Sequence, residues 1–442
     1  QKEYSKGHRM IFVDGPAPED SRARLAYARK IMRSFVSRAF RKPLDESTID
    51  RLVDIVEEVS STPGKSFEDG IKQAIAACLA SPRFLFRVEI QPEPDNPARI
   101  VPLDEYSLAA RLSFFLWSSV PDDELLSLAF RKQLRANLRA QVERMLEDPR
   151  SQRLVENFVG QWLQVRNLRL LEPDAKTFPD WDRRLAQAME QETEALFEAI
   201  LREDRSVLDF LGADFTYVNE RLARHYDIDG VEGDAFVKVK LPPNRPGGIL
   251  GHGSYLTLTS NPTRTSPVKR GKYVLENILG TPPPPPPPNV PELEESPAAA
   301  ESASLRQRLE EHRANPMCAS CHARMDPIGF GFENYDGIGA WRLRDGGFPI
   351  DPAGQLVSGE AFQGPSDLRT LLLKTKRDEF TRCLTEKLLT YALGRGLEYY
   401  DKCALDEITK GLAKHGYRFS ALVQEIVRST PFQMRRGETP SE

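Results

Sequence analysis

Residues 318–322 carry the side chains of this chain whose types and spacing most clearly indicate chemistry. Cys318, Cys321 and His322 form an uninterrupted C-x-x-C-H run. Two thiols at this spacing can form thioether bonds to both vinyl groups of one porphyrin, and the histidine that follows then binds the iron from the proximal side. The run therefore predicts one covalently attached haem c with His322 as its proximal iron ligand.

Two other uses of a cysteine pair fit less well. A structural zinc site needs four ligands, usually from a second Cys or His pair at short range. No such pair follows the run, and the nearest histidine, His312, lies before an Asn315-Pro316 step. A thioredoxin-like dithiol would need a strand-to-helix setting, which the sequence around Cys318 does not indicate.

The second axial ligand of the iron is not fixed by the sequence. Met434 and His252 are the two candidates, and the third possibility is that no protein side chain binds at that position. A methionine thioether would favour electron transfer, whereas an open position would allow peroxide or oxygen chemistry. Glu333 could then act as an acid–base group beside the iron, although the capping of a turn is the simpler expectation for this residue.

Haem propionates need cationic or polar partners when they are buried. Several such side chains flank predicted turns near the motif, and ordinary surface charge is the alternative interpretation. The candidates are Arg264, Lys269, Arg270, Trp341 and Arg342.

Composition limits the class of protein and its partners. The 442 residues have a net charge of −4, which gives no indication of nucleic-acid binding, and no apolar run approaches the roughly 18 residues that a membrane span needs. Covalent haem attachment normally takes place outside the cytoplasmic membrane, and the sequence starts at Gln1 rather than at a methionine. We therefore expect a removed leader or a longer precursor, and a periplasmic or cell-surface location.

The remaining cysteines fit such an oxidising compartment. Cys78 shares an apolar helical face with Ile71 and Ile75 and is expected in a core. Cys383 and Cys403 both fall in predicted helices, and we expect a disulfide between them. Two free buried thiols are the alternative.

The pattern of apolar residues predicts a mainly α protein, with several helical bundles and a small irregular, β-hairpin haem domain. The predicted domains are helical at 20–95 and 100–230, haem c-binding at 242–360 with the polyproline run Pro282–Pro288, and helical at 377–437, packing on the haem domain. Hairpins are expected at 342–360, with turns at 345–347 and 351–354. The glutamates of a helix near 185–200 are expected to form a solvated face.

Several longer motifs occur together in this chain. They are SPRFLFR at 81–87, RLSFFLW at 111–117, TRTSPVKRG at 263–271, the block 318–342, LTEKLLTYALGRG at 384–396 and PFQMRR at 431–436. With these motifs the chain resembles the large haem c proteins of planctomycetes and their relatives, which are built from domains of unknown function. The resemblance implies haem and this architecture, and it implies an upstream half or another cytochrome subunit as a partner. It implies no particular reaction.

Three functions remain open for such a chain. The first is a periplasmic or cell-surface monohaem c-type cytochrome module that passes electrons, through a redox partner protein, within a larger redox protein or complex. The second is a haem peroxidase or oxidase that acts on an extracellular substrate, which would need an open iron and an acid–base pair. In the third, the haem is a structural part of a helical scaffold. We expect the first.

Overall fold

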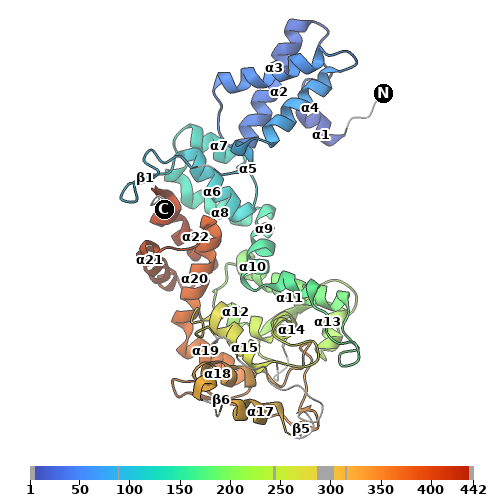
Figure 1. The fold of residues 1–442 in the computed structure, drawn as a ribbon, viewed down its shortest axis with the longest axis vertical. Coiled ribbons are helices and arrows are strands. Elements are labelled where there is room, and N and C mark those ends of the chain that lie inside the picture. The colour runs from blue at the N-terminus through green and yellow to red at the C-terminus, as the bar shows by residue number, and fades with distance from the viewer. Residues whose placement is uncertain (1–4, 88, 242–244, 286–302, 314–315, 438–442) are drawn as a thin grey trace. The chain divides into compact units, whose positions relative to one another are not determined.

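The computed structural model describes residues 5–87, 89–241, 245–285, 303–313 and 316–437, and it is mainly α-helical, as predicted (Figure 1). The chain forms two compact units. Unit 1 comprises Gln1–Met145 and Val427–Glu442, and unit 2 comprises Leu146–Ile426. Pro286–Pro288 of the predicted polyproline run lie outside the described residues. Within the described ranges, no helix is both long and apolar enough to cross a membrane.

Unit 1 begins with a small helical bundle whose core contains Cys78, as predicted. Acidic or hydroxyl side chains cap its helices: Asp20 accepts a hydrogen bond from Ala23 N, and Asp45 accepts one from Thr48 N. The helices and strands of this unit are α1 (Lys6–Ile11), α2 (Ser21–Ala39), α3 (Glu46–Ser60), α4 (Phe67–Leu79), α5 (Pro82–Leu85), β1 (Ile100–Pro102), α6 (Glu105–Trp117), α7 (Asp123–Phe130), η1 (Arg135–Asn137), α8 (Leu138–Glu147), α23 (Thr430–Gln433) and β8 (Met434–Arg436).

The end of the chain returns to unit 1. Strand β8 pairs antiparallel with β1, with Met434 opposite Pro102. On α6, the buried Arg111 donates hydrogen bonds to the carbonyl oxygens of Pro431 (2.8 Å) and Phe432 (2.7 Å). The compact units therefore divide the chain at places other than the predicted boundaries: the block predicted at 100–230 divides after Met145, and the tail from Val427 joins unit 1.

Within the described residues, unit 2 is built from helices and three two-stranded antiparallel sheets, β2–β3, β4–β5 and β6–β7. Its elements are η2 (Pro149–Ser151), α9 (Gln152–Leu154), η3 (Val155–Val159), α10 (Gly160–Trp162), η4 (Val165–Leu170), α11 (Arg183–Arg202), α12 (Asp209–Gly212), β2 (Phe215–Val218), α13 (Glu220–His225), β3 (Val237–Lys240), η5 (Ile249–Gly251), α14 (Gly253–Leu258), α15 (Pro267–Tyr273), η6 (Val274–Ile278), α17 (Leu305–His312), α18 (Pro316–Phe330), β4 (Arg344–Asp345), β5 (Phe348–Pro349), β6 (Ala353–Gln355), β7 (Ala361–Gln363), α19 (Pro365–Thr375), α20 (Arg377–Leu393), η7 (Tyr399–Asp401), α21 (Lys402–Lys414) and α22 (Phe419–Arg428).

The strands of unit 2 agree only partly with the sequence analysis. Hairpin β4–β5 turns at Gly346-Gly347, as predicted. The second hairpin, β6–β7, turns at 356–360 rather than at the predicted 351–354, because the Asp351-Pro352 step precedes its first strand. The pair β2–β3 was not predicted: β2 falls within the region 100–230 that was expected to be helical, and β3 lies after that region.

The predicted disulfide between Cys383 and Cys403 is not present, because both thiols are free. Helices α20 and α21 are neighbours, joined by an ion pair between Arg382 and Asp406. Cys383, however, is buried against the π-helical turn η6, with its Sγ 3.4 Å from the carbonyl oxygen of Asn277. Cys403 is exposed on α21. The two side chains therefore lie in different surroundings even though their helices are adjacent.

We predict that the two thiols differ strongly in reactivity. Burial raises the pKa of Cys383 to about 11, so this thiol is protonated and shielded from reagents. Brief iodoacetamide treatment of the native, unreduced protein should alkylate Cys403 and leave Cys383 unmodified, whereas unfolding without reductant should expose both. Peptide mass spectrometry measures this, with Cys403→Ser as the control. If both residues resist alkylation in the unfolded, unreduced protein, the bridge exists after all.

Candidate functional site

The C-x-x-C-H run lies entirely within α18. Its spacing of three and four residues places Cys318, Cys321 and His322 on one face of the helix. Both thiols are free and half-buried. The sulfur of Cys321 lies 3.8 Å from the carbonyl oxygen of Pro284, so the start of the polyproline run passes beside this face. A single helix therefore presents two thiols and an imidazole to the same space.

His322 is held by a carboxylate one helical turn later. Its Nδ1 lies 3.0 and 3.1 Å from the two oxygens of Asp326, whose side chain has no exposed surface. Arg313 supplies a cation, with its Nε 3.7 Å from Asp326. Because Nδ1 is engaged by the carboxylate, Nε2 is the ring nitrogen that remains to bind a metal.

Helix α17 brings a second histidine, His312, to this site. Its place in the sequence did not predict this position. Leu305 and Leu309 pack with Phe330 of α18 in a small apolar cluster. At the end of α17, the ring of His312 lies 5.0 Å from that of His322, centroid to centroid. The Asn315-Pro316 step thus separates the two histidines in sequence but not in space. Even so, within the described ranges no three or more His, Cys, Asp or Glu side chains are arranged to hold a metal ion.

Close contact with α15 fixes the C-terminal half of α18. A Cβ atom on Gly271 would lie 1.9 Å from the carbonyl oxygen of Met325, and one on Gly329 would lie 1.9 Å from that of Pro267. Only glycine permits this approach of the two backbones. The Met325 side chain, three residues after His322 on the same helix, is buried.

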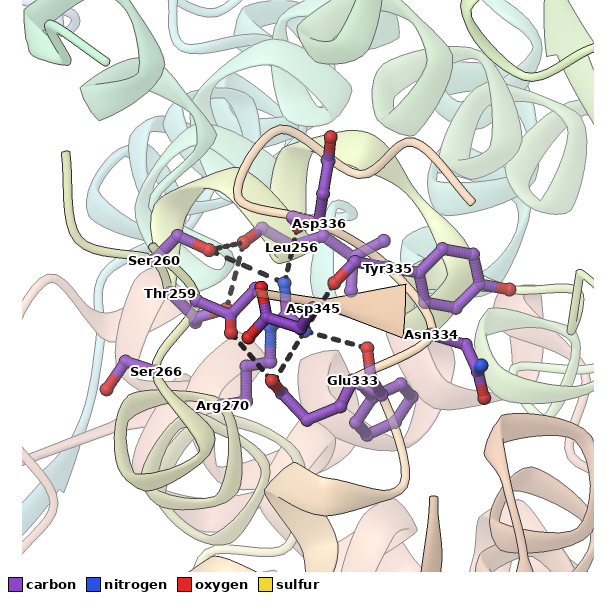
Figure 2. A network of polar contacts seen from close by, with 12 residues as sticks. Leu256, Thr259, Ser260, Ser266, Arg270, Glu333, Asn334, Tyr335, Asp336 and Asp345 are labelled. Carbon is purple, nitrogen blue, oxygen red and sulfur yellow. Dashed lines mark hydrogen bonds and ion pairs between the residues drawn. The ribbon is translucent and has the colours of Figure 1, made fainter. Parts of the chain in front are cut away.

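A buried arginine on α15 organises the loop that follows α18 (Figure 2). The Arg270 guanidinium donates hydrogen bonds to the carbonyl oxygens of Phe332 (2.7 Å), Tyr335 (2.9 Å) and Asp336 (2.7 Å). It also forms an ion pair of 3.0 Å with Glu333. Arg270 is 0% exposed, so these groups, rather than water, compensate its charge.

Glu333 belongs to this ion-pair network and does not cap a turn. Its Oε2 accepts hydrogen bonds from Thr265 Oγ1 (2.6 Å) and Arg342 (3.3 Å), while Oε1 faces Arg270. Burial raises the pKa of Glu333, and the charges of Arg270 and Arg342 oppose that shift. With both oxygens engaged and the side chain buried, the carboxylate is not placed for exchange of protons with a substrate.

The predicted propionate partners lie mainly around the same network. Arg342 binds Glu333 and also pairs with Asp345 at 2.5 Å. Trp341 packs against Tyr335 at 5.2 Å. Arg264 donates to the carbonyl oxygen of Thr265, and Lys269 to the side chain of Asn261. Both terminal nitrogens of Arg270 are bonded to protein groups, which argues against a role with a propionate.

The two residues suggested as second axial ligands lie in different units. Met434 is half-buried in β8 of unit 1. His252 of unit 2 is buried, with Nδ1 bonded to Thr193 at 3.0 Å and Nε2 facing Glu192 at 3.9 Å. That gap has no room for an iron and its porphyrin, so the arrangement does not favour His252 as a ligand.

The acidic face of α11 is not solvated as expected. Glu192 is buried and accepts hydrogen bonds from Tyr226 (2.5 Å) and Thr216 (2.7 Å), and burial raises its pKa to about 7. Glu190 is buried and pairs with Arg169 at 2.9 Å. Strand β2 contacts Glu192 and the turn η4 contacts Glu190, and the helical period of α11 alone could not reveal these neighbours.

Comparison with family models accounts for most of the chain. Four models match in order: "Protein of unknown function (DUF1595)" at 27–89, "(DUF1592)" at 103–228, "(DUF1588)" at 246–345 and "(DUF1585)" at 358–432. The chain belongs to the planctomycete-type family built from these four domains. The resemblance suspected from the motifs is thereby confirmed. No curated protein and no solved structure matches the chain.

The family blocks also describe where the site lies. Helices α15 and α18, with the Arg270 network, all fall within the DUF1588 block. Helices of the DUF1585 block contact it: for example, Cys383 of α20 lies against Asn277, and Leu368 of α19 lies beside Gly331. The C-terminal helices thus help to support the segment that carries the motif.

We predict that Arg270→Met will destabilise unit 2 by about 3–5 kcal/mol, the usual loss when one partner of a buried ion pair is removed. The variant leaves three carbonyl oxygens without their donor and leaves Glu333 with Arg342 as its cation. Urea unfolding followed by circular dichroism measures the change.

The matched control is Lys272→Met on the same helix. Lys272 forms a partly exposed ion pair of 3.6 Å with Glu276, so its loss should cost about 0–1 kcal/mol. If Arg270→Met is no more harmful than this control, the loop does not depend on the buried guanidinium.

Proposed function

We propose that this protein is a monohaem c-type cytochrome module that transfers electrons within a larger redox protein or complex. One observation carries the proposal: a single helical face presents two free thiols and an imidazole whose Nδ1 is already engaged. These are the groups that covalent attachment and proximal ligation of haem c require. When bound, haem c supplies an iron that gains and loses single electrons.

The side chains around the motif would have distinct tasks. Cys318 and Cys321 form the thioethers, and His322 offers Nε2 to the iron. Asp326 accepts the Nδ1 proton of His322, which orients the ring and raises its basicity. Arg313 at Asp326 and Arg324 on α18 are cations beside the motif, and Arg264 and Arg342 remain further candidates for the propionates.

The second axial position separates electron transfer from catalysis. Met434 remains a proposed ligand, whereas the ring of His312, 5.0 Å from that of His322 between centroids, leaves no room for a porphyrin between the two histidines. The alternative function, a haem peroxidase or oxidase, needs an acid–base group with access to the iron, and the engaged carboxylate of Glu333 does not favour it. A low-spin spectrum of the oxidised protein would support electron transfer, whereas a high-spin spectrum would support the enzyme.

We further propose a periplasmic or cell-surface location, because covalent haem attachment takes place outside the cytoplasmic membrane. The proposed partners are an upstream N-terminal half or another cytochrome subunit, and a redox partner protein. Fractionation of cells, followed by haem staining of each fraction, tests the location.

Replacement of both Cys318 and Cys321 by alanine should abolish covalent haem, because no thioether can then form. Haem staining of a denaturing gel, after expression with a haem-attachment system, should show stain in the wild type and none in the double variant. Cys403→Ala is the control, since it removes an exposed cysteine outside the motif. Haem retained by the double variant would contradict the proposal.

Asp326→Asn should raise the midpoint potential of the haem. The carboxylate stabilises the oxidised iron by making His322 more basic, and its negative charge has the same effect. If the oxidised state loses about 1–2 kcal/mol of stabilisation, the midpoint potential rises by roughly 40–90 mV for one electron. Redox titration measures the shift, with Glu311→Gln as a control that removes an exposed carboxylate from α17. An unchanged or lower potential in Asp326→Asn would refute this role.

A further inference from the structure

A pocket of about 60 Å³ opens in unit 1 where two of the longer motifs, residues 81–87 and 111–117, come together. Helix α5 contributes the first motif and α6 the second (Figure 1). The charged side chains that line the pocket are Arg41, Lys42, Arg83, Arg87 and Arg111, with Glu89 as the carboxylate among them.

The charge of Glu89 is already matched by arginines. Arg111 binds it through two nitrogens, with Nε 2.9 Å from Oε1, and Arg435 lies 3.7 Å from Oε2. Glu89 is therefore not available to neutralise the other cations. The pocket retains the positive charges of Arg41, Lys42, Arg83 and Arg87.

Arg41 is a buried cation without a carboxylate partner among the described residues. Its guanidinium donates hydrogen bonds to the carbonyl oxygens of Arg83 (2.8 Å), Phe84 (3.3 Å) and Phe86 (2.8 Å). These carbonyls satisfy its donors but do not cancel its charge. Burial and the nearby charge of Arg87 lower the pKa of Arg41. The positive charge of Arg41 is therefore poorly compensated, and a bound anion would stabilise it.

Arg87 has donors to spare. Its guanidinium lies 5.2 Å from the centroid of the Phe114 ring, and within the described residues it makes no hydrogen bond or ion pair. Arg83 donates to the hydroxyl of Thr48 at 3.3 Å. The carboxylate of Asp45 is close enough to Arg83 for an electrostatic attraction between their charges. Its Oδ1, however, caps α3, where it accepts hydrogen bonds from Thr48 N and Ser47 Oγ.

We propose that this pocket binds a small tetrahedral oxyanion, a phosphate or sulfate group. Guanidinium groups match such oxygens with paired donors, and Arg87 and Arg83 are the residues that would supply them. A single water needs roughly 10–15 Å³ of such space, so about 60 Å³ holds several waters or one oxyanion of this size. The proposal does not depend on haem.

The oxyanion could be free or the end group of an ester. Inorganic phosphate, inorganic sulfate and glycerol 3-phosphate are therefore the probes, each titrated into the full chain by calorimetry at constant ionic strength, with chloride as the reference anion. Binding of glycerol 3-phosphate at least as tight as that of inorganic phosphate would identify an ester end group, and weaker binding would identify the free anion. Both results support the site.

Arg87→Gln and Arg83→Gln should each weaken binding about tenfold or more, the effect of losing one charge-assisted contact. The control is Arg22→Gln, which removes an exposed arginine of α2 outside the pocket and should bind like the wild type. Circular dichroism melting of each variant separates loss of binding from loss of fold. No binding by the wild type, binding by an acidic polypeptide alone, or equal binding by a folded Arg83→Gln/Arg87→Gln double variant would overturn the proposal.

Discussion

The buried guanidinium of Arg270 is the interaction on which the architecture of unit 2 depends most. It holds the carbonyl oxygens of Phe332, Tyr335 and Asp336 and pairs with Glu333, so the irregular segment after α18 has one defined path. A lysine could not replace it, because one ammonium lacks the planar fork that reaches several acceptors at once. A charge that is completely buried is stable only when paired and hydrogen-bonded in this way. The loop and α15 are therefore mutually dependent.

The candidate haem site combines a local arrangement with a tertiary one. The thiols, His322 and Asp326 all lie on α18, so helical geometry alone brings them together. Arg313 and His312 come from α17, and their positions depend on the packing of Leu305 and Leu309 against Phe330. The contacts between α15 and α18 through Gly271 and Gly329 then hold the helix in place. An attachment helix anchored in this way would restrict movement of a bound porphyrin.

Much of the fold could be predicted because the helical periodicity of apolar residues and the residues that end helices or form turns are local signals. The helices of the C-terminal block and the first hairpin after the motif were expected close to where they occur. Two of the predictions that differ from the structure concern what covers a helix. Glu190 and Glu192 of α11 were expected to be solvated, yet η4 lies against the first and β2 against the second, and both are buried. Likewise Cys383 faces η6 rather than the neighbouring α21, which prevents the expected bridge.

The sequence by itself determined the helical class, the order of the four blocks and the C-x-x-C-H run on which the haem proposal depends, because each of these is encoded in short stretches of contiguous chain. The tertiary structure alone decided which charged groups have partners. Glu333 looked like a turn residue, but it is paired with Arg270 and Arg342, which lie 63 residues before it and 9 residues after it. The cations that lie near Arg87, such as Arg41 and Arg111, likewise come from separate segments of the chain. Such pairings depend on which surfaces are removed from water, and that is set by packing between distant segments.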